Sequence, residues 1–524
     1  MSLLILHIQK YKILLMLIIN SSNYIPESFA YEFGEIPDIF LPIGNTRLID
    51  ILIKRLYENG ESIFIILPDD FNKEKLSYSN LSHAEIFFLK ESQSVEIFDL
   101  FRDMLKNKGE KTKYINRLAF PLLRDSEFEN YKKSSSGLPS FGLSFNSDFQ
   151  NDYLKKNERN KSLVDLNESI YQLYLFNPEN TNKLKTIDLR ITTHYYNLRA
   201  ELVGLRFFNR LKIEKNKISK TVEYSQKGIE EANWFINTKK YLPHISPVII
   251  DISKDKKTYT YEYLPMVSLS EIYTYGQIDI NYWDLIFESI SSLLKDMNQC
   301  ALDLIKENNL SIKEQDLDNS DNELFINKTI ERLKLFSKTK KLTYPFEVSL
   351  NNKDKINVEN IIEVLSPILK KIKNKKIYIH GDFCLSNILY DSRLNIIKLV
   401  DPRGHKNIDN FFEMIKSHKY DLTKLSHSLL GFYDLINVGE IESESFNIAN
   451  NVVNIKCNYA VDFYHRMIYE KAFDYNFLDG IKLKDYLPIS ILLFLSMLPF
   501  HSDNEIKQIT LLGNAIRIYE SLFE

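Results

Sequence analysis

Short apolar runs alternate with amphipathic stretches in the first part of the chain, which predicts an α/β domain. Three mainly apolar runs, residues 13–19, 62–67 and 84–89, have the length and the Ile, Leu and Phe content of buried strands. Residues 46–58, between the first two runs, have helical spacing. Strands that alternate with helices predict a parallel sheet with helices on its faces.

The pattern changes in the second part of the chain. Residues 209–214 and 217–223 are short alternating runs around Lys215 and Asn216, which predicts a hairpin. The remainder has mainly helical periodicity, so we expect a helical C-terminal region. The helices are expected at residues 282–306, 358–371, 420–436, 447–473, 487–499 and 504–523. The polar residues 307–323 are expected to form a loop or a frayed insertion.

Length and composition limit the classes of protein to consider. A chain of 524 residues is long enough for two or more domains, and 44% hydrophobic residues suit packed cores. The formal net charge of −3 gives no sign of nucleic-acid binding or of attraction to an anionic membrane. The three cysteines are scattered without metal spacing, which is typical of a reducing compartment.

The N-terminal residues do not have the pattern of a membrane span or of an export signal. Residues 3–6 and 13–19 are apolar, but Lys10 and Lys12 interrupt them and neither run has the length of a membrane span. No small-residue cleavage site follows. We therefore expect no membrane span and a cytoplasmic protein.

The stretch IYIHGDFCLSNILYDSRLNIIKLVDP, residues 377–402, carries the candidate chemistry. Two short strands, residues 376–379 and 395–400, flank a turn. Asp382 is followed five residues later by Asn387, and Asp401 follows the second strand. In phosphotransferases, an aspartate in this place orients the acceptor hydroxyl and accepts its proton, while the asparagine and the second aspartate hold Mg²⁺.

This motif, H-G-D-x-x-x-x-N followed by a strand and D, resembles the aminoglycoside phosphotransferase and choline kinase family, a branch of the protein-kinase-like fold. The resemblance implies ATP, or another nucleoside triphosphate, and Mg²⁺ as cofactors. It assigns Asp382 as catalytic base, His380 as an orienting group of the catalytic site, and Asn387 and Asp401 as metal ligands. The alternative is that Asp382 and Asp401 only cap turns. The match of four polar residues in order and spacing favours the site.

A phosphate clamp is expected further upstream. Lys220 lies on the second strand of the predicted hairpin, and the helix that follows carries Glu230 and Glu231. A strand lysine paired with a helix glutamate positions nucleotide phosphates in kinases. We favour Glu231, because EANWF resembles the E-A-x-x-[YF] pattern of small-molecule kinases. Glu230, about 100° round the helix, is the competitor.

Two further segments complete the predicted site. The stretch YTYEYLP, residues 259–265, looks like the strand and hinge between kinase lobes, so backbone groups of Glu262, Tyr263 and Leu264 are expected to contact an adenine. Arg403 is a candidate contact for phosphate or an acidic substrate, and a surface salt bridge is the equally weighted alternative. Asp421 stands where this fold has a structural aspartate, and we expect it buried and hydrogen-bonded.

The N-terminal domain has its own resemblance. PDIFLPIGNTRLIDILIKRLYENG resembles a signature of sugar-phosphate nucleotidyltransferases, with Pro37 and Pro42 at its two prolines. Asp38 stands where those enzymes have a basic residue, and residues 20–23, NSSN, replace their glycine-rich loop. Side chains in such a loop hinder the approach of backbone N–H groups to phosphates. We therefore expect a degenerate domain that binds a sugar nucleotide or only supports the second half.

The order of the parts gives the fold class and a function. We expect a nucleotidyltransferase-like (Rossmann-like) parallel-sheet domain at residues 1–195. A bilobal protein-kinase-like domain follows, with its smaller lobe and hinge at residues 196–265 and a helical C-lobe at residues 266–524. The arrangement resembles bacterial proteins of capsule and surface-polysaccharide synthesis, which implies a kinase acting on a hydroxyl of a sugar, polyol or amino alcohol. A non-catalytic scaffold and a bifunctional kinase and nucleotidyltransferase are the alternatives.

Overall fold

The computed structural model describes residues 15–21, 24–44, 46–50, 53, 62–71, 84–89, 111–116, 119–121, 186–188, 195–196, 199, 209–214, 216–222, 225–254 and 257–523. The chain divides into two compact units, Met1–Val203 and Gly204–Glu524. Each unit is described by itself.

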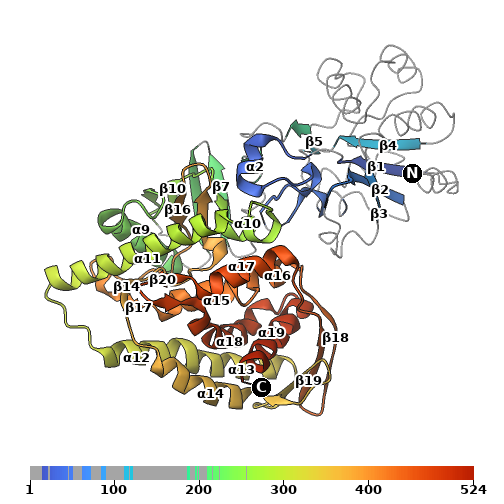
Figure 1. Ribbon diagram of the computed structural model, residues 1–524. Helices are drawn as coiled ribbons and strands as arrows, with labels where there is room; N and C mark the ends of the chain where they lie inside the picture. Colours follow the sequence, from blue (N-terminus) through green and yellow to red (C-terminus); the bar gives the residue numbers. More distant parts are fainter. Residues whose placement is uncertain are drawn as a thin grey trace. The chain divides into compact units, whose positions relative to one another are not determined.

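The first unit contains a four-stranded parallel sheet (Figure 1). Strand β1 (Leu15–Asn20) pairs with β2 (Ser62–Pro68) on one side and β4 (Lys111–Asn116) on the other, and β3 (Ala84–Leu89) lies outside β2. All three pairings are parallel. The three strands predicted from apolar runs are all present. Strand β4 was not predicted, because its sequence KTKYIN has no continuous apolar run.

The other described parts of this unit are short. Helix α2 (Glu27–Phe33) contributes Phe29 and Phe33, whose rings contact Tyr195 edge-on at 4.9 and 6.4 Å between centroids. The Tyr195 hydroxyl donates to the carbonyl of Pro42 over 2.6 Å. Strands β5 (Ala119–Pro121) and β6 (Thr186–Asp188) form an antiparallel pair, and η1 (Asp38–Phe40) is a single 3₁₀ turn. Of the predicted helix at residues 46–58, residues 48–50 and 53 are helical and most of the rest lies outside the described residues.

The second unit begins with an antiparallel sheet in the order β7-β8-β10-β9. Strands β7 (Asn209–Glu214) and β8 (Lys217–Val222) form the predicted hairpin, followed along the chain by β9 (Ile249–Ile252) and β10 (Thr258–Glu262). Helix α9 (Ser225–Tyr241) packs on β10, because Phe235 lies 6.0 Å from the Tyr259 ring and 5.6 Å from the Tyr261 ring.

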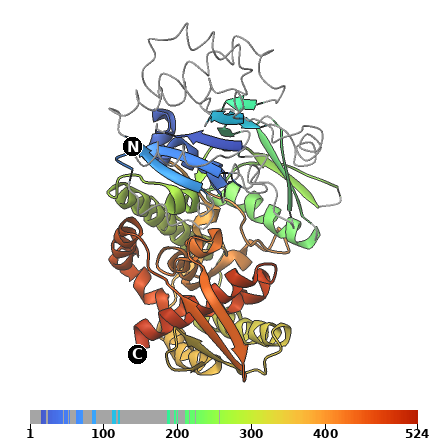
Figure 2. The same ribbon diagram turned by 90° about the vertical axis from the view of Figure 1, so that its right-hand side faces the viewer.

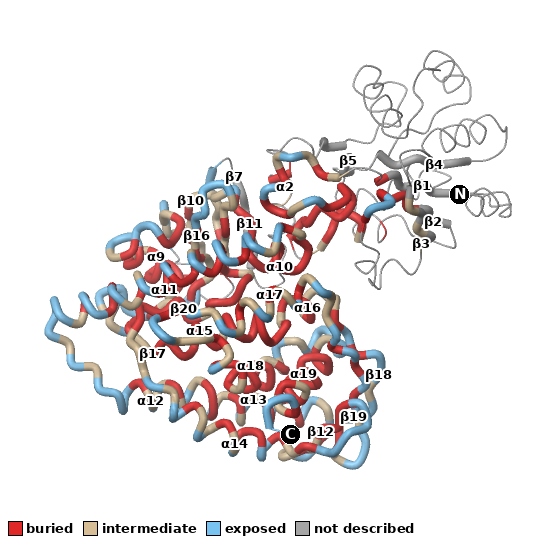
Figure 3. Tube along the Cα trace, in the orientation of Figure 1, coloured by how far each residue is buried: buried red, intermediate tan, exposed pale blue. Residues whose placement is uncertain are grey.

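Most of the remaining second unit is helical (Figures 1 and 2). The helices are α10 (Leu269–Tyr275), α11 (Tyr282–Glu307), α12 (Glu314–Asn322), α13 (Lys328–Thr339), α14 (Val358–Lys371), α15 (Lys419–Leu429), α16 (Tyr433–Val438), α17 (Phe463–Asp474), α18 (Leu487–Met497) and α19 (Glu505–Phe523). Short helical turns are η6 (Glu323–Asn327), η7 (Leu385–Asn387), η8 (Phe411–Met414), η9 (Leu483–Tyr486) and η10 (Leu498–His501). Helix α18 lies against α13, α15 and α19, and Figure 3 shows it almost wholly buried.

Small sheets hold the segment that carries the candidate chemistry. Strands β15 (Ile388–Asp391) and β16 (Ile396–Leu399) form the predicted strand, turn and strand, with β11 (Val267–Ser268) on the edge of β15. Strand β14 (Lys376–Tyr378) pairs antiparallel with β17 (Ile415–Ser417). Strands β20 (Asn476–Leu478) and β21 (Ile481–Lys482) form a further hairpin. Residues 379–387, the candidate catalytic loop, therefore lie between β14 and β15, and Asp401 lies just beyond β16.

The prediction of an all-helical C-terminal region was wrong for the first part of residues 447–473. Strands β18 (Ser443–Ala449) and β19 (Val452–Cys457) form a hairpin, and β19 also pairs with β12 (Glu347–Leu350), which pairs with β13 (Ile356–Asn357). The turn residues Asn450 and Asn451 have φ of 52° and 62°. Asparagine tolerates this left-handed conformation, and two such residues make the tight turn that suits a hairpin.

The prediction of a loop at residues 307–323 was wrong for its second half. Helix α12 occupies this half, and the π-helical turn η6 follows it. The helix is polar, but its Leu317 and Asp321 are buried. Asp321 lies 3.1 Å from the buried ammonium of Lys419, and Asp318 accepts a 2.8 Å hydrogen bond from Asn374. Contacts from distant parts of the chain therefore fix this helix, and local periodicity does not reveal them.

One helical stretch of the described residues, Leu483–His501, has the length and apolar character of a membrane span. Of its most apolar window, 67% is buried inside the unit, as in the core helix of a globular protein.

Candidate active site

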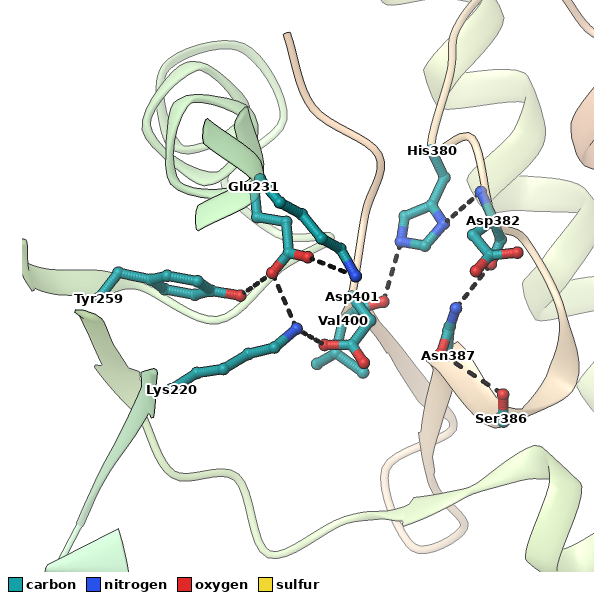
Figure 4. Close-up of polar contacts among 10 residues, drawn as sticks. Lys220, Glu231, Tyr259, His380, Asp382, Ser386, Asn387, Val400 and Asp401 are labelled. Carbon is teal, nitrogen blue, oxygen red and sulfur yellow. Dashed lines mark hydrogen bonds and ion pairs between the residues drawn. The ribbon is translucent and has the colours of Figure 1, made fainter. Parts of the chain in front are cut away.

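Lys220 lies between two carboxylates (Figure 4). Its ammonium is 2.8 Å from Glu231 on α9 and 2.7 Å from Asp401 beyond β16. The side chains of Lys220 and Glu231 are 3% exposed, whereas that of Asp401 is 38% exposed. The Lys220–Glu231 pair is therefore buried and fixed, whereas the Asp401 carboxylate remains accessible to a ligand.

The electrostatics of this group keep the lysine charged. Burial alone would lower the pKa of Lys220, but the carboxylates of Asp401 and Glu231 outweigh it and hold the pKa above its ordinary value. Tyr259, directly opposite Lys220 in the β8–β10 pairing, donates its hydroxyl to Glu231. Glu230 accepts a 2.9 Å bond from Gln226 on the helix surface, so Glu231 is the glutamate that pairs with Lys220.

The backbone of the catalytic loop is held by Asp421 on α15. Its two carboxylate oxygens accept the N–H groups of His380 at 2.7 Å and Gly381 at 2.8 Å. Asp421 is fully buried, and burial raises its pKa to about 7 in spite of these two bonds. This confirms the expectation that Asp421 is buried and hydrogen-bonded.

His380 connects the loop to the strand that precedes Asp401. Its Nε2 lies 3.0 Å from the carbonyl oxygen of Val400, and its Nδ1 accepts the N–H of Asp382 at 3.3 Å. A ring that donates to a carbonyl and accepts from an amide is neutral. Burial also lowers the pKa of His380 to about 4. The ring is therefore suited to orienting the loop and not to moving a proton at neutral pH.

Asp382, which is partly exposed, and Asn387, which is buried, lie together in this loop. The Asn387 amide donates to the backbone carbonyl of Asp382 over 2.8 Å, and its side-chain oxygen accepts a bond of 3.4 Å from the Ser386 hydroxyl. The Asp382 carboxylate lies 2.9 Å from the ammonium of Lys424 on α15, with 32% of the Asp382 side chain exposed. Burial would raise the pKa of Asp382, but the charges of Lys424 and Arg403 prevail and hold it below its ordinary range. The group is therefore a carboxylate at neutral pH.

The segment from Asp401 to Gly404 is pressed against α9. Asp401 has φ of 55°, in the left-handed region, which turns the chain directly after the strand. A Cβ on Gly404 would lie 1.5 Å from the carbonyl oxygen of Glu230. Only glycine fits this approach, and the approach keeps Asp401 beside the Lys220–Glu231 pair.

Arg403 is not the surface salt bridge considered as its alternative. Its backbone N–H donates to the His380 carbonyl over 2.9 Å, and its stem is the nearest neighbour of Gly381. Its guanidinium lies 5.1 Å from the centre of the Tyr420 ring. The side chain thus extends from the catalytic loop to α15 and forms no ion pair among the described residues.

The predicted hinge is partly occupied by protein contacts. The Glu262 carboxylate accepts the Val248 N–H at 2.9 Å, and the Glu262 N–H donates to the Val248 carbonyl at 3.0 Å. The Tyr263 N–H donates to the carbonyl of Asn216. A contact with an adenine would therefore use other backbone groups of this segment, the Leu264 N–H among them.

The residues present suit a magnesium ion held together with nucleotide phosphates. Among the described residues, no three His, Cys, Asp or Glu side chains gather as a metal site. Magnesium in phosphotransferases is commonly bound by one or two protein ligands, with phosphate oxygens and water completing the coordination. The Asp401 carboxylate and the Asn387 amide oxygen fit that pattern, and the ion would neutralise phosphate charge.

In the first unit, Asp38 is buried at the start of η1 and accepts a 2.6 Å bond from the Ser21 hydroxyl. The same hydroxyl accepts the Ile39 N–H at 3.1 Å, and the Ser21 N–H donates to the Ile66 carbonyl. The buried Asp38 carboxylate thus lies beside Ser21, directly after β1. A phosphate bound there would meet a group of like charge.

Sequence reasoning missed Lys424 and the hydroxyl of Tyr259. Lys424 follows Asp421 by three residues on α15, so the two side chains share a helix face. This spacing was a usable signal. Asp421 holds the catalytic loop, so Lys424 on the same helix face also faces that loop. The sequence predicts Tyr259 only as part of a strand with alternating tyrosines, with no role for its hydroxyl.

The solved structures to which this chain is similar are distant in sequence and in structure. No protein-family model matches the sequence, and no curated protein matches it. A choline/ethanolamine kinase family protein from Mesorhizobium loti is 10% identical, with 61% of this chain and 86% of that chain covered at a TM-score of 0.32. A GDP and kanamycin complex of APH(2")-IIia is 10% identical, with coverage of 61% and 92% and a TM-score of 0.34.

Choline kinase LicA from Streptococcus pneumoniae is 13% identical, with coverage of 61% and 91% and a TM-score of 0.31. The part of this chain that is covered is the C-terminal one. Since these TM-scores lie below 0.5, the functional argument rests on the geometry of the site. The nucleotidyltransferase-like interpretation of residues 1–195 and the link to surface polysaccharides stay predictions.

Proposed function

We propose that this chain is a small-molecule kinase with a protein-kinase-like second unit. It transfers the γ-phosphoryl group of ATP, or another nucleoside triphosphate, to a hydroxyl group with the help of Mg²⁺. The observation that carries the proposal is Lys220, whose ammonium lies between Glu231 and Asp401 at 2.8 and 2.7 Å. A charged lysine fixed in this way can bind phosphate oxygens beside a metal-binding carboxylate.

The catalytic loop supplies the second half of the reaction. The Asp382 carboxylate orients the acceptor hydroxyl and takes its proton as the oxygen bonds to the γ-phosphorus. The bond from that phosphorus to the β–γ bridging oxygen breaks, and the nucleoside diphosphate leaves. Lys424, 2.9 Å from Asp382, adds positive charge where negative charge gathers during transfer.

The acceptor class and the biological setting are proposed from the resemblance alone. A sugar, polyol or amino alcohol in cytoplasmic surface-polysaccharide synthesis fits it. We propose that the first unit supports the kinase or binds a sugar nucleotide without catalysis, because Ser21 belongs to the segment that replaces the phosphate-binding loop. Its hydroxyl donates to Asp38, an acidic residue in the place of a basic one.

The test is Asp382→Asn in an acceptor screen that detects nucleoside diphosphate release from ATP and Mg²⁺. We expect wild type to turn over at least one alcohol and the variant to lose about 10²-fold or more of that rate, because the general base is absent. Asp409→Asn, an exposed aspartate in the loop that follows Asp401, is the control and should keep full activity. Turnover in Asp382→Asn at the wild-type rate would contradict the assignment.

A further inference from the structure

Three cations gather beside the catalytic loop without a role in the proposed transfer. Lys328 and Arg332 lie four residues apart on α13 and therefore share one face of the helix. Arg403 follows Asp401, and its stem packs against Gly381 of the catalytic loop. All three side chains reach solvent, since Lys328 and Arg332 are partly exposed and Arg403 is exposed.

Aromatic rings connect these cations to one another. The Arg403 guanidinium lies 5.1 Å from the Tyr420 ring centre, and Tyr420 in turn lies 5.5 Å from Phe325 on η6, the turn that leads directly into α13. The Arg332 guanidinium lies 4.6 Å from the Phe500 ring on η10. Phe500 is 65% exposed. The cations and rings thus form a strip that begins at the catalytic loop.

The positive charge of this strip is not neutralised by ion pairs. Among the described residues, Lys328, Arg332 and Arg403 form no salt bridge, while the nearby Asp321 and Asp382 are paired with Lys419 and Lys424. Burial lowers the pKa of Lys328, and the charges of Arg403 and Arg332 lower it further, against the weaker opposite effect of Glu323 and Glu331. Burial and Arg403 likewise lower the pKa of Arg332, although Tyr420 opposes them. Like charges held this close favour a bound anion.

The backbone at this place is also unusual. Glu323–Asn327 is a π-helical turn that joins α12 to α13. Such turns are rare and are found frequently at functional sites, because the extra residue redirects the side chains that follow. Here the residues that follow it directly are Lys328 and the rest of α13.

We propose that Lys328, Arg332 and Arg403 bind an anionic group of the acceptor, a phosphate or a carboxylate, so that the hydroxyl of the same molecule reaches Asp382. Arginine suits this task, because its planar guanidinium bonds two oxygens of a phosphate or carboxylate at once. The inference rests on the proposed kinase function and narrows its substrate class to alcohols that already carry a negative charge.

The test measures binding to the full-length protein loaded with ADP and Mg²⁺, so that the nucleotide site is filled. The probes are glycerol, glycerol 3-phosphate, glycerate and choline. Calorimetry measures the binding of each probe. We expect glycerol 3-phosphate or glycerate to bind about tenfold or more tightly than glycerol and choline. Arg332→Gln and Lys328→Gln should each weaken the anionic probe about tenfold. Lys338→Gln, an exposed lysine on another face of α13, should leave it unchanged.

Several results would overturn the inference: no measurable binding of either anion, equal or tighter binding of glycerol or choline, or unchanged affinity in Arg332→Gln. Thermal unfolding of each variant confirms that it is folded.

Failure of the inference is separable from failure of the proposed function. If ADP and Mg²⁺ stabilise the protein but the anions do not bind, only the anionic acceptor is wrong; if ADP and Mg²⁺ have no effect, the kinase proposal itself fails.

Discussion

At the scale of single residues, the site depends on a few buried or half-buried charges whose states are set by their neighbours. Lys220 remains charged because two carboxylates lie within 2.8 Å, and Asp382 remains ionised because Lys424 stands 2.9 Å away. His380 is neutral because it is buried between a carbonyl and an amide. Each of these states follows from direct contacts that link distant parts of the sequence.

Lys424 should control the acid limb of the pH–rate profile. Its charge is one reason that the pKa of Asp382 lies below the ordinary range, so Lys424→Gln should raise that pKa and move the loss of activity to higher pH. We also expect about tenfold or more slower transfer, because charge stabilisation is lost. The measurement is kcat/KM against pH. Lys424→Arg should keep the acid limb of the wild-type profile. If the acid limb of Lys424→Gln lies at the same pH as that of wild type, Lys424 does not act on Asp382.

His418 should make the stability of the second unit depend on pH. It is fully buried, its Nδ1 accepts the Lys375 N–H, its Nε2 lies 2.6 Å from the Tyr486 hydroxyl, and burial lowers its pKa to about 3. Its unfolded pKa is about 6.5, so only the unfolded state gains a proton as pH falls below that value. The stability it supports is therefore present above pH of about 6.5 and is lost progressively towards pH 3.

His418→Gln removes this titration. Urea unfolding between pH 8 and 5 should give His418→Gln a lower free energy of unfolding than wild type at pH 8. Below pH 6.5, the free energy of unfolding of the variant should fall less steeply with falling pH, by about 1.4 kcal/mol per pH unit. His244→Gln, at an exposed histidine, is the matched control and should keep the wild-type slope. Parallel curves for His418→Gln and wild type would rule out this role.

At the scale of elements, α9 is the part on which the proposed phosphate clamp of Lys220 and Glu231 depends. Its Asn233 donates to the carbonyls of His405 and Lys406, and its Trp234 donates to the Ile379 carbonyl over 3.1 Å. These bonds tie the helix to the segments on either side of Asp382 and Asp401. Glu231 is therefore presented to Lys220 by contacts with the catalytic segments as well as by its own helix.

Gly404→Ala should disturb this arrangement. The added Cβ would meet the Glu230 carbonyl at 1.5 Å, so α9 or the Asp401 segment must shift. We expect nucleotide affinity to fall by tenfold to about 10²-fold, because displacements near 1 Å separate Glu231, Lys220 and Asp401. Lys406→Ala, an exposed side chain in the same segment, should bind nucleotide normally. Unchanged affinity in Gly404→Ala, measured by calorimetry, would show that the close approach is not required.

Two elements show where local pattern misleads. Residues 443–457 have enough apolar positions to suit either a helix or strands, and the two asparagines at the tip decide for a hairpin by adopting positive φ. Helix α12 is almost wholly polar, but Lys419 from α15 neutralises Asp321 in the interior. In both cases the deciding interaction is absent from the hydrophobic periodicity.

At the scale of the whole molecule, the two compact units can be followed separately. Both tryptophans of the chain, Trp234 and Trp283, are in the second unit and fully buried, so tryptophan fluorescence reports its unfolding alone. We expect ATP, GTP or CTP to stabilise this transition only with Mg²⁺, by about 2.7 kcal/mol at a hundredfold excess over Kd.

Asp401→Ala should abolish that Mg²⁺-dependent stabilisation, because it removes the carboxylate beside Lys220. Asp409→Ala, at an exposed aspartate, is the control and should respond like wild type. Equal stabilisation with and without Mg²⁺, or a full response in Asp401→Ala, would count against a metal site at this residue. No response to any nucleotide would favour the non-catalytic scaffold.

The sequence by itself determined the elements with strong periodicity and the order of the candidate chemistry. The three apolar strands of the first unit, the hairpin at β7 and β8, and helix α14 at Val358–Lys371 lie where the pattern predicts them. The spacing from His380 to Asp401 identified the loop, because these residues are close in sequence and their geometry follows from strand, turn and strand.

Only the tertiary structure decided which distant residues meet. Lys424 beside Asp382, Tyr259 on Glu231 and the close approach of Gly404 to α9 join segments far apart in sequence. Spacing cannot reveal such pairs, because side-chain contacts across segments are set by packing, and packing also decides which polar groups lose their water. The strip of Lys328, Arg332 and Arg403 belongs to the same class: its charge matters because the fold brings α13 to the catalytic loop.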